Sequence, residues 1–177
     1  MEREHPFVEL ARSAIRTYLA TGEVIDPPAE PGDPPPSGVF VSLHHPARPG
    51  EVEGPLRGCI GTIGPREPSV RSEIARSAVS AAVADPRFPP LEPGEVDELE
   101  VTVYLLGDPE PITGLDQLDP DRYGVIVEGP GGRRGLLLPA LPGLTDAAEQ
   151  VDIARRKAGI SPADPVRLYR FEAEIIH

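Results

Sequence analysis

The segment Leu56–Gly61 has the sequence Leu-Arg-Gly-Cys-Ile-Gly and contains the only cysteine of the 177-residue chain. Side chains alternate along an extended segment, so Arg57 and Cys59 are expected on one face. A guanidinium close to a thiol favours the thiolate form of a cysteine. The segment therefore indicates that Cys59 could be a catalytic nucleophile, with Arg57 stabilising an anion beside it.

Two glycines flank the thiol in this segment. Glycine within a strand often marks a bulge or a place where a ligand or another backbone approaches closely. We therefore expect a shallow binding slot formed by Arg57, Gly58, Cys59 and Gly61. A packing role for Cys59 is the alternative, because an isolated cysteine commonly behaves as a small buried hydrophobe.

A cysteine nucleophile usually needs a base, and two of the four histidines, His44 and His45, fall near the motif strand. If residues 39–44 pair with the motif strand, His44 is the candidate base. The alternative is a solvated histidine at a strand end. No metal site is predicted, because the chain offers one thiol and no histidine pair at helical spacing.

Arg87 lies in the segment 85–91, where a predicted helix ends in Asp-Pro. Its guanidinium could bind a carboxylate or phosphate, or it could cap the last carbonyls of the preceding helix. The glycine-rich segment 129–135 lacks the Lys-Ser/Thr ending of a phosphate loop and does not open a helix. It is therefore predicted to be a hairpin turn.

Composition narrows the classes of partner. The formal net charge of −12 and a pI near 4.7 disfavour nucleic acids and anionic membranes, which bind cationic surfaces. One cysteine cannot form an internal disulfide, and the sequence contains no long apolar run. A cytoplasmic protein is therefore expected.

The periodicity of apolar residues predicts an α+β fold with a mainly antiparallel sheet and flanking helices. Several strands are joined by hairpin-sized connections, which a purely parallel sheet cannot use. Residues 26–37 contain six prolines and are predicted to be a surface loop. The expected helices cover residues 6–21, 69–84 and 145–158, with Thr145 as a cap, and the expected strands cover residues 39–44, 56–63, 99–105, 124–128, 135–138 and 166–176.

The motif Leu-Arg-Gly-Cys-Ile-Gly and seven further segments resemble the AMMECR domain family, whose microbial members are called AmmeMemoRadiSam system protein A. The further segments are Phe40–Leu43, Asp85–Leu91, Glu98–Leu106, Gly124–Gly129, Gly135–Pro139, Lys157–Ile160 and Leu168–Ile175. The resemblance identifies residues 1–177 as a single AMMECR-like domain. It implies a larger and a smaller subdomain, with the signature strand near the cleft between them.

The resemblance supplies no established reaction and no cofactor. Microbial members are often encoded with, or fused to, a Memo-type protein and a radical S-adenosylmethionine enzyme, which implies a shared pathway. Two departures matter: the chain lacks the tryptophan and the second cysteine that family members often carry after the segment ending at Pro139. A mechanism that needs a second thiol is therefore not supported.

Two functions follow as hypotheses. In the first, the protein is an accessory or binding component that acts with a Memo-type protein and a radical S-adenosylmethionine enzyme and docks a partner or small anionic ligand at Arg57, Cys59 and Arg87. In the second, it is an enzyme that uses Cys59 as a thiolate nucleophile, with Arg57 stabilising an anion and His44 as base. An RNA- or nucleotide-binding module is disfavoured by the acidic charge and the 5% aromatic content.

Overall fold

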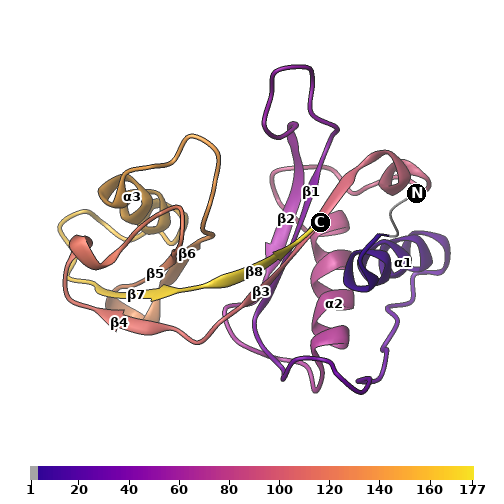
Figure 1. The fold of residues 1–177 in the computed structure, drawn as a ribbon, viewed down its shortest axis with the longest axis horizontal. Coiled ribbons are helices and arrows are strands. Elements are labelled where there is room, and N and C mark those ends of the chain that lie inside the picture. Colours follow the sequence, from indigo (N-terminus) through magenta and orange to yellow (C-terminus); the bar gives the residue numbers. More distant parts are fainter. Residues whose placement is uncertain (1–3) are drawn as a thin grey trace. The chain divides into compact units, whose positions relative to one another are not determined.

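The computed structural model describes residues 4–177, which divide into two compact units. The first unit contains the described residues up to Leu106 together with Glu174–His177, and the second contains Gly107–Ala173. Each unit is built on one four-stranded sheet (Figure 1). The predicted α+β class is confirmed, with the strands divided between two sheets.

The first unit combines a sheet of strand order β2-β1-β3-β8 with two helices. Strand β1 pairs antiparallel with both β2 and β3, so β2, the motif strand, lies at one edge. The elements are α1 (Pro6–Thr21), β1 (Val39–His44), β2 (Leu56–Gly61), α2 (Val70–Val83), a short 3₁₀ turn (Glu95–Glu98), β3 (Glu100–Leu106) and β8 (Ala173–Ile176).

Local sequence explains where both helices begin and end. The ring of His5 accepts a hydrogen bond from the Phe7 amide at the start of α1, and Gly22 ends that helix with a φ of 76°. Ser69 caps α2 through a hydrogen bond from the Ser72 amide. Helix α2 ends before Asp85, which precedes a proline and is therefore disfavoured in helical conformation.

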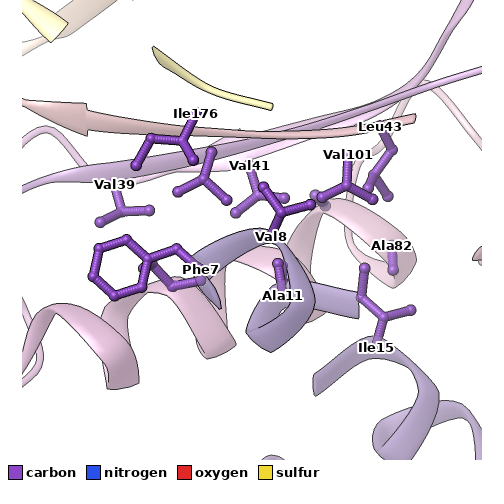
Figure 2. Close-up of a cluster of buried hydrophobic side chains, with 14 of the residues drawn as sticks. Phe7, Val8, Ala11, Ile15, Val39, Val41, Leu43, Ala82, Val101 and Ile176 are labelled. Atoms are coloured by element: carbon purple, nitrogen blue, oxygen red, sulfur yellow. The ribbon is translucent and has the colours of Figure 1, made fainter. Parts of the chain in front are cut away.

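Both helices cover the same face of the first sheet, and the main hydrophobic core lies between them and the strands. Figure 2 shows Phe7, Val8, Ala11 and Ile15 of α1 turned toward the alternate residues of β1. The apolar strand residues of this face are Val39, Val41, Leu43, Val101, Val103 and Leu105. Their neighbours in sequence must therefore lie on the opposite face.

The proline-rich segment 26–37 forms no helix or strand and is tied to α2. Arg71 donates from Nε to Asp33 Oδ2 at 2.8 Å and forms an ion pair with Glu30. Ser72 donates from Oγ to Asp26 Oδ1 at 2.7 Å. These contacts hold Asp26, Glu30 and Asp33 of the segment to one helix.

The second unit has a sheet of strand order β4-β7-β5-β6 and one helix. Helix α3 packs its apolar side on this sheet, and its cap is Asp146 rather than the predicted Thr145, since Asp146 accepts from the Ala148 and Glu149 amides. The elements are β4 (Glu110–Ile112), β5 (Gly124–Glu128), β6 (Arg134–Leu137), α3 (Ala147–Lys157) and β7 (Arg167–Phe171), with 3₁₀ turns at Leu115–Gln117 and Pro130–Gly132.

The prediction of one final strand over residues 166–176 is wrong. Strand β7 ends at Phe171 and β8 begins at Ala173, and the two strands join different sheets. Alternation of side chains along a sequence does not show where one strand ends and the next, which joins another sheet, begins. Strand β4 was not predicted, because its three residues include Pro111.

Candidate functional site

The motif strand β2 places Cys59 on the face of the first sheet opposite the helices. Cys59 pairs with Ser42, and Ser42 pairs in turn with Thr102 on β3. Directly paired residues share a face, so the three side chains form a line across the sheet. His177 continues the line, because its Nδ1 lies 3.2 Å from Thr102 Oγ1. We call these four residues, Cys59, Ser42, Thr102 and His177, the polar row.

Cys59 lies outside the hydrophobic core cluster under the helices. The core cluster under the helices includes Ile60 among its neighbours, and its residues on β1 and β3 alternate with Ser42 and Thr102. Ser42 and Thr102 are only 3% and 5% exposed. Cys59 is half-buried and pairs with a hydroxyl-bearing residue rather than with an apolar one.

The two glycines of the motif are needed for close packing. A Cβ at Gly58 would lie 2.2 Å from the Ala81 carbonyl oxygen of α2, on the helix side of the sheet. A Cβ at Gly61 would lie 2.2 Å from the Val39 carbonyl oxygen and would also meet the Phe40 ring. The space expected to form a slot beside these glycines is therefore filled by protein atoms.

A β-bulge interrupts the alternation on which the shared face of Arg57 and Cys59 was predicted. Leu43 pairs with Gly58, but His44 pairs with Leu56, so Arg57 is an extra residue in β2. The guanidinium of Arg57 donates from Nε to Glu95 Oε1 at 2.6 Å and from Nη2 to Glu95 Oε2 at 3.1 Å.

The third guanidinium nitrogen of Arg57, Nη1, donates to the Pro89 carbonyl at 2.9 Å. The Arg57 side chain is only 11% exposed. Burial raises the pKa of Glu95, but hydrogen bonds from Arg57 and the Glu92 amide outweigh it, and the pKa is lowered. All three nitrogens of Arg57 are thus engaged, so the prediction that Arg57 stabilises an anion is not supported by its contacts.

Arg87 and Asp85 lie beside Cys59 instead. Asp85, whose side chain is 2% exposed, accepts a hydrogen bond from the Cys59 amide at 2.9 Å. Arg87 donates to the same carboxylate from Nε at 3.0 Å and from Nη2 at 2.7 Å, and its Nη2 also lies 3.4 Å from the Cys59 carbonyl. Arg87 therefore reaches the backbone of Cys59 on the outer edge of β2.

This edge contact defines the geometry of the Cys59–Ser42 pair. The amide and carbonyl of Cys59 both bind the segment Asp85–Arg87, so they point away from β1. In an antiparallel ladder, residues whose amide and carbonyl point away from the neighbouring strand form non-hydrogen-bonded pairs. The two residues of such a pair lie closer together than those of a hydrogen-bonded pair. The Cα atoms of Cys59 and Ser42 are consequently closer than those of a hydrogen-bonded pair.

Electrostatics link the same residues. Burial raises the pKa of Asp85, but hydrogen bonds from Arg87 and from the Cys59 amide lower it to about 2. The pKa of Arg87 is raised, first by its hydrogen bond to Asp85 and further by the charges of Asp85 and Cys59. Burial, with the charges of Glu53 and Cys59, raises the pKa of Tyr104 to about 12.

His44 lies on the same face of the sheet as the polar row, opposite the helices. We call it the polar face, although Phe40 and Tyr104 also lie on it. Its Nδ1 is 3.3 Å from Ser42 Oγ and 3.5 Å from Glu53 Oε1. Burial lowers the pKa of His44, while the charges of Glu53 and Glu100 oppose that shift. His44, the candidate base, therefore contacts Ser42, which is the cross-strand partner of Cys59.

Sequence reasoning missed Asp85, Ser42 and Thr102. Asp85 was interpreted only as the end of a helix, although an Asp followed two residues later by Arg can form a local ion pair. Ser42 and Thr102 occupy the polar positions of two alternating strands, and that pattern was the available signal. Over residues 4–177 we find no helix long and apolar enough to cross a membrane, and no group of three or more metal-ligating side chains.

The described residues define an α+β protein whose first sheet has an apolar helix-covered face and an opposite face on which Cys59, Ser42 and Thr102 lie with aromatic residues. A family model described as AMMECR1 matches residues 8–176. The chain belongs to the AMMECR1 family, as the motifs predicted.

Relatives span several microbial groups. A Thermotoga maritima protein is 44% identical over 179 residues, with 97% of each chain covered. The Clostridium acetobutylicum protein CA_C1420 is 39% identical and longer, so that the match covers 96% of this chain but 35% of that protein. The crystal structure of the uncharacterised protein PH0010 from Pyrococcus horikoshii superposes with a TM-score of 0.83 at 39% identity, covering 96% of this chain and 88% of that one.

Proposed function

We propose that the protein is an accessory binding component that works through Cys59, the polar row and the neighbouring pair Asp85–Arg87. The observation that carries this proposal is the position of Cys59. It is half-buried on the polar face of the sheet, paired with Ser42, and bonded through its backbone to a segment whose arginine is 53% exposed.

As part of the same proposal, the partners are a Memo-type protein and a radical S-adenosylmethionine enzyme in the cytoplasm. The support is family membership together with the acidic charge, which favours a protein or small molecule over nucleic acid. The structure adds an exposed cation, Arg87, at the edge of an otherwise acidic chain. Arg87 is one of the binding residues that the sequence predicted.

The test measures binding of the full chain to a purified Memo-type protein and, separately, to a radical S-adenosylmethionine enzyme from the same genome. Arg87→Gln and Cys59→Ser are expected to weaken binding to at least one of them by about tenfold. Arg16→Gln is the matched control, because Arg16 is 52% exposed on α1 and also ion-paired. Absence of binding to both proteins, or equal loss in the control, would overturn the proposal.

A thiolate enzyme is the second candidate, favoured by the presence of a fixed cation at Cys59 and of His44 beside Ser42. In this version Arg87 rather than Arg57 stabilises the anion. The measurement is the pH dependence of alkylation of Cys59, the only cysteine. A nucleophile requires the rate to reach its plateau well below the ordinary cysteine pKa of about 8.5, and an unshifted profile eliminates this candidate.

A further inference from the structure

Arg57 and Arg87 lie on or beside the motif strand, and they differ in how many guanidinium nitrogens are already hydrogen-bonded. Arg57 uses all three nitrogens, on Glu95 and Pro89. Arg87 uses Nε and Nη2, and within the described part of the chain its Nη1 makes no hydrogen bond. Arg87 is also 53% exposed, against 11% for Arg57. Arg87 is thus the cation that keeps one nitrogen, Nη1, available to a ligand.

Asp85 fixes where that nitrogen points. Its buried carboxylate accepts from the Cys59 amide, from the Arg87 amide at 3.1 Å, and from two guanidinium nitrogens of Arg87. One carboxylate therefore holds the backbone of the thiol residue and the arginine head at the same time. A two-point hydrogen bond sets the plane of a guanidinium, which a single contact does not.

We propose that Asp85 is a positioning residue that holds Arg87 to receive a carboxylate on a small ligand located at Cys59. This rests on the proposed function and assigns its ligand class. The positive charge of Arg87 is already paired with the carboxylate of Asp85. A ligand with one negative charge therefore suits it better than a ligand with two, which favours a carboxylate over a phosphate. The ligand is therefore a small organic acid whose remaining part lies against the thiol.

Alkylation of the single cysteine tests this directly, because iodoacetate carries a carboxylate and iodoacetamide is its neutral analogue. In both reactions the thiolate sulfur forms a bond to the methylene carbon and iodide leaves. The measured quantity is the ratio of the iodoacetate rate to the iodoacetamide rate, which cancels changes in thiol reactivity. Arg87→Gln is expected to lower this ratio about fivefold. Arg57→Gln is the matched control and is expected to leave it unchanged.

Asp85→Asn separates positioning from charge. Removal of a negative charge near the thiol would, through charge alone, raise the ratio, since the anionic reagent is then repelled less. Loss of positioning lowers the ratio, because the guanidinium is no longer held in place. We expect a fall of about threefold, and a rise would overturn the proposal.

Arg87→Lys covers the case in which Asp85→Asn does not fold, which melting curves would reveal. Lysine keeps the charge but lacks the fork that binds Asp85 at two points. Positioning predicts a lowered ratio for this variant, and a ratio equal to that of the unaltered protein would overturn the proposal. The alkylation ratio is independent of partner binding, so the proposed function and the ligand assignment fail separately.

Discussion

The two faces of the first sheet are both buried, but they are built from different chemistry. On the helix-covered face Val39, Val41 and Leu43 are fully buried and contact the apolar side chains of α1 and α2. On the other face Ser42 and Thr102 are nearly as buried and carry hydroxyl groups, and the rings of Phe40 and Tyr104 lie beside them. Burial of a hydroxyl costs free energy unless it is hydrogen-bonded, whereas burial of a valine stabilises the fold.

The comparison teaches that burial alone does not identify the functional face. Burial of apolar side chains on the helix-covered face stabilises the unit. Burial of the polar groups of Ser42 and Thr102 beside Cys59 on the other face costs some of that free energy. Substitutions on the helix-covered face should therefore lower the free energy of unfolding strongly. Substitutions on the polar face should change binding or thiol reactivity with a smaller loss of stability.

The largest loss is expected for Gly58→Ala. The added Cβ would lie 2.2 Å from the Ala81 carbonyl oxygen, and backbone of α2 cannot move away without disturbing the core. Urea denaturation should show a loss of more than about 3 kcal/mol. Gly64→Ala is the matched control, since nothing lies within 4 Å of a Cβ there. A similar loss of stability at both positions would show that the contact between a Cβ at Gly58 and the Ala81 carbonyl does not cause the loss.

The next largest effect contrasts neighbours on β1 and β3. Leu43→Ala removes a fully buried side chain from the core and should cost about 3 kcal/mol. Thr102→Val on the polar face keeps the volume but removes the hydroxyl that lies 3.2 Å from His177, and should cost about 1 kcal/mol. The free energies of unfolding in urea test the order, and an inverted order would contradict the division of roles.

Sequence patterns were sufficient for the helices of the first unit and for its strands β1, β2 and β3. The alternation of apolar residues located β1 and β3, in Val39–His44 and in residues 99–105. The proline after Asp85 located the end of α2. These features depend on local backbone preferences, which a sequence displays directly. The division of the last strand between two sheets depends on tertiary pairing and was missed.

The candidate site was predicted only in part. The motif strand and Cys59 were identified, and Arg87 was considered with two alternative roles. The shared face of Arg57 and Cys59 was predicted from unbroken alternation, but the strand contains a bulge at Arg57. The contact of Asp85 with Cys59 joins residues 26 positions apart, and nothing in the local sequence of either residue reports it.

Acid titration sharpens the comparison at the edge of β2. The pKa of Asp85 is lowered from 3.8 to about 2, so its charged form stabilises the fold above the unfolded-state pKa. This stability, about 2 kcal/mol, should be lost as the pH falls from about 4 through 2. Asp85→Asn should remove that part of the pH dependence in urea denaturation. An unchanged acid profile in this variant would show that Asp85 does not titrate as described.

The smallest effect is expected at His44, whose pKa is lowered mainly by burial on the polar face. A lowered pKa means that the unfolded chain binds the proton more tightly, so the stability is present above the unfolded-state pKa of 6.5 and is lost as the pH falls below it. His44→Gln should flatten the stability profile between about pH 7 and pH 5. His45→Gln is the control, since His45 is exposed at the end of the same strand. If the profile flattens only in the control, the buried histidine is not the titrating group and the polar face contributes nothing to the pH response.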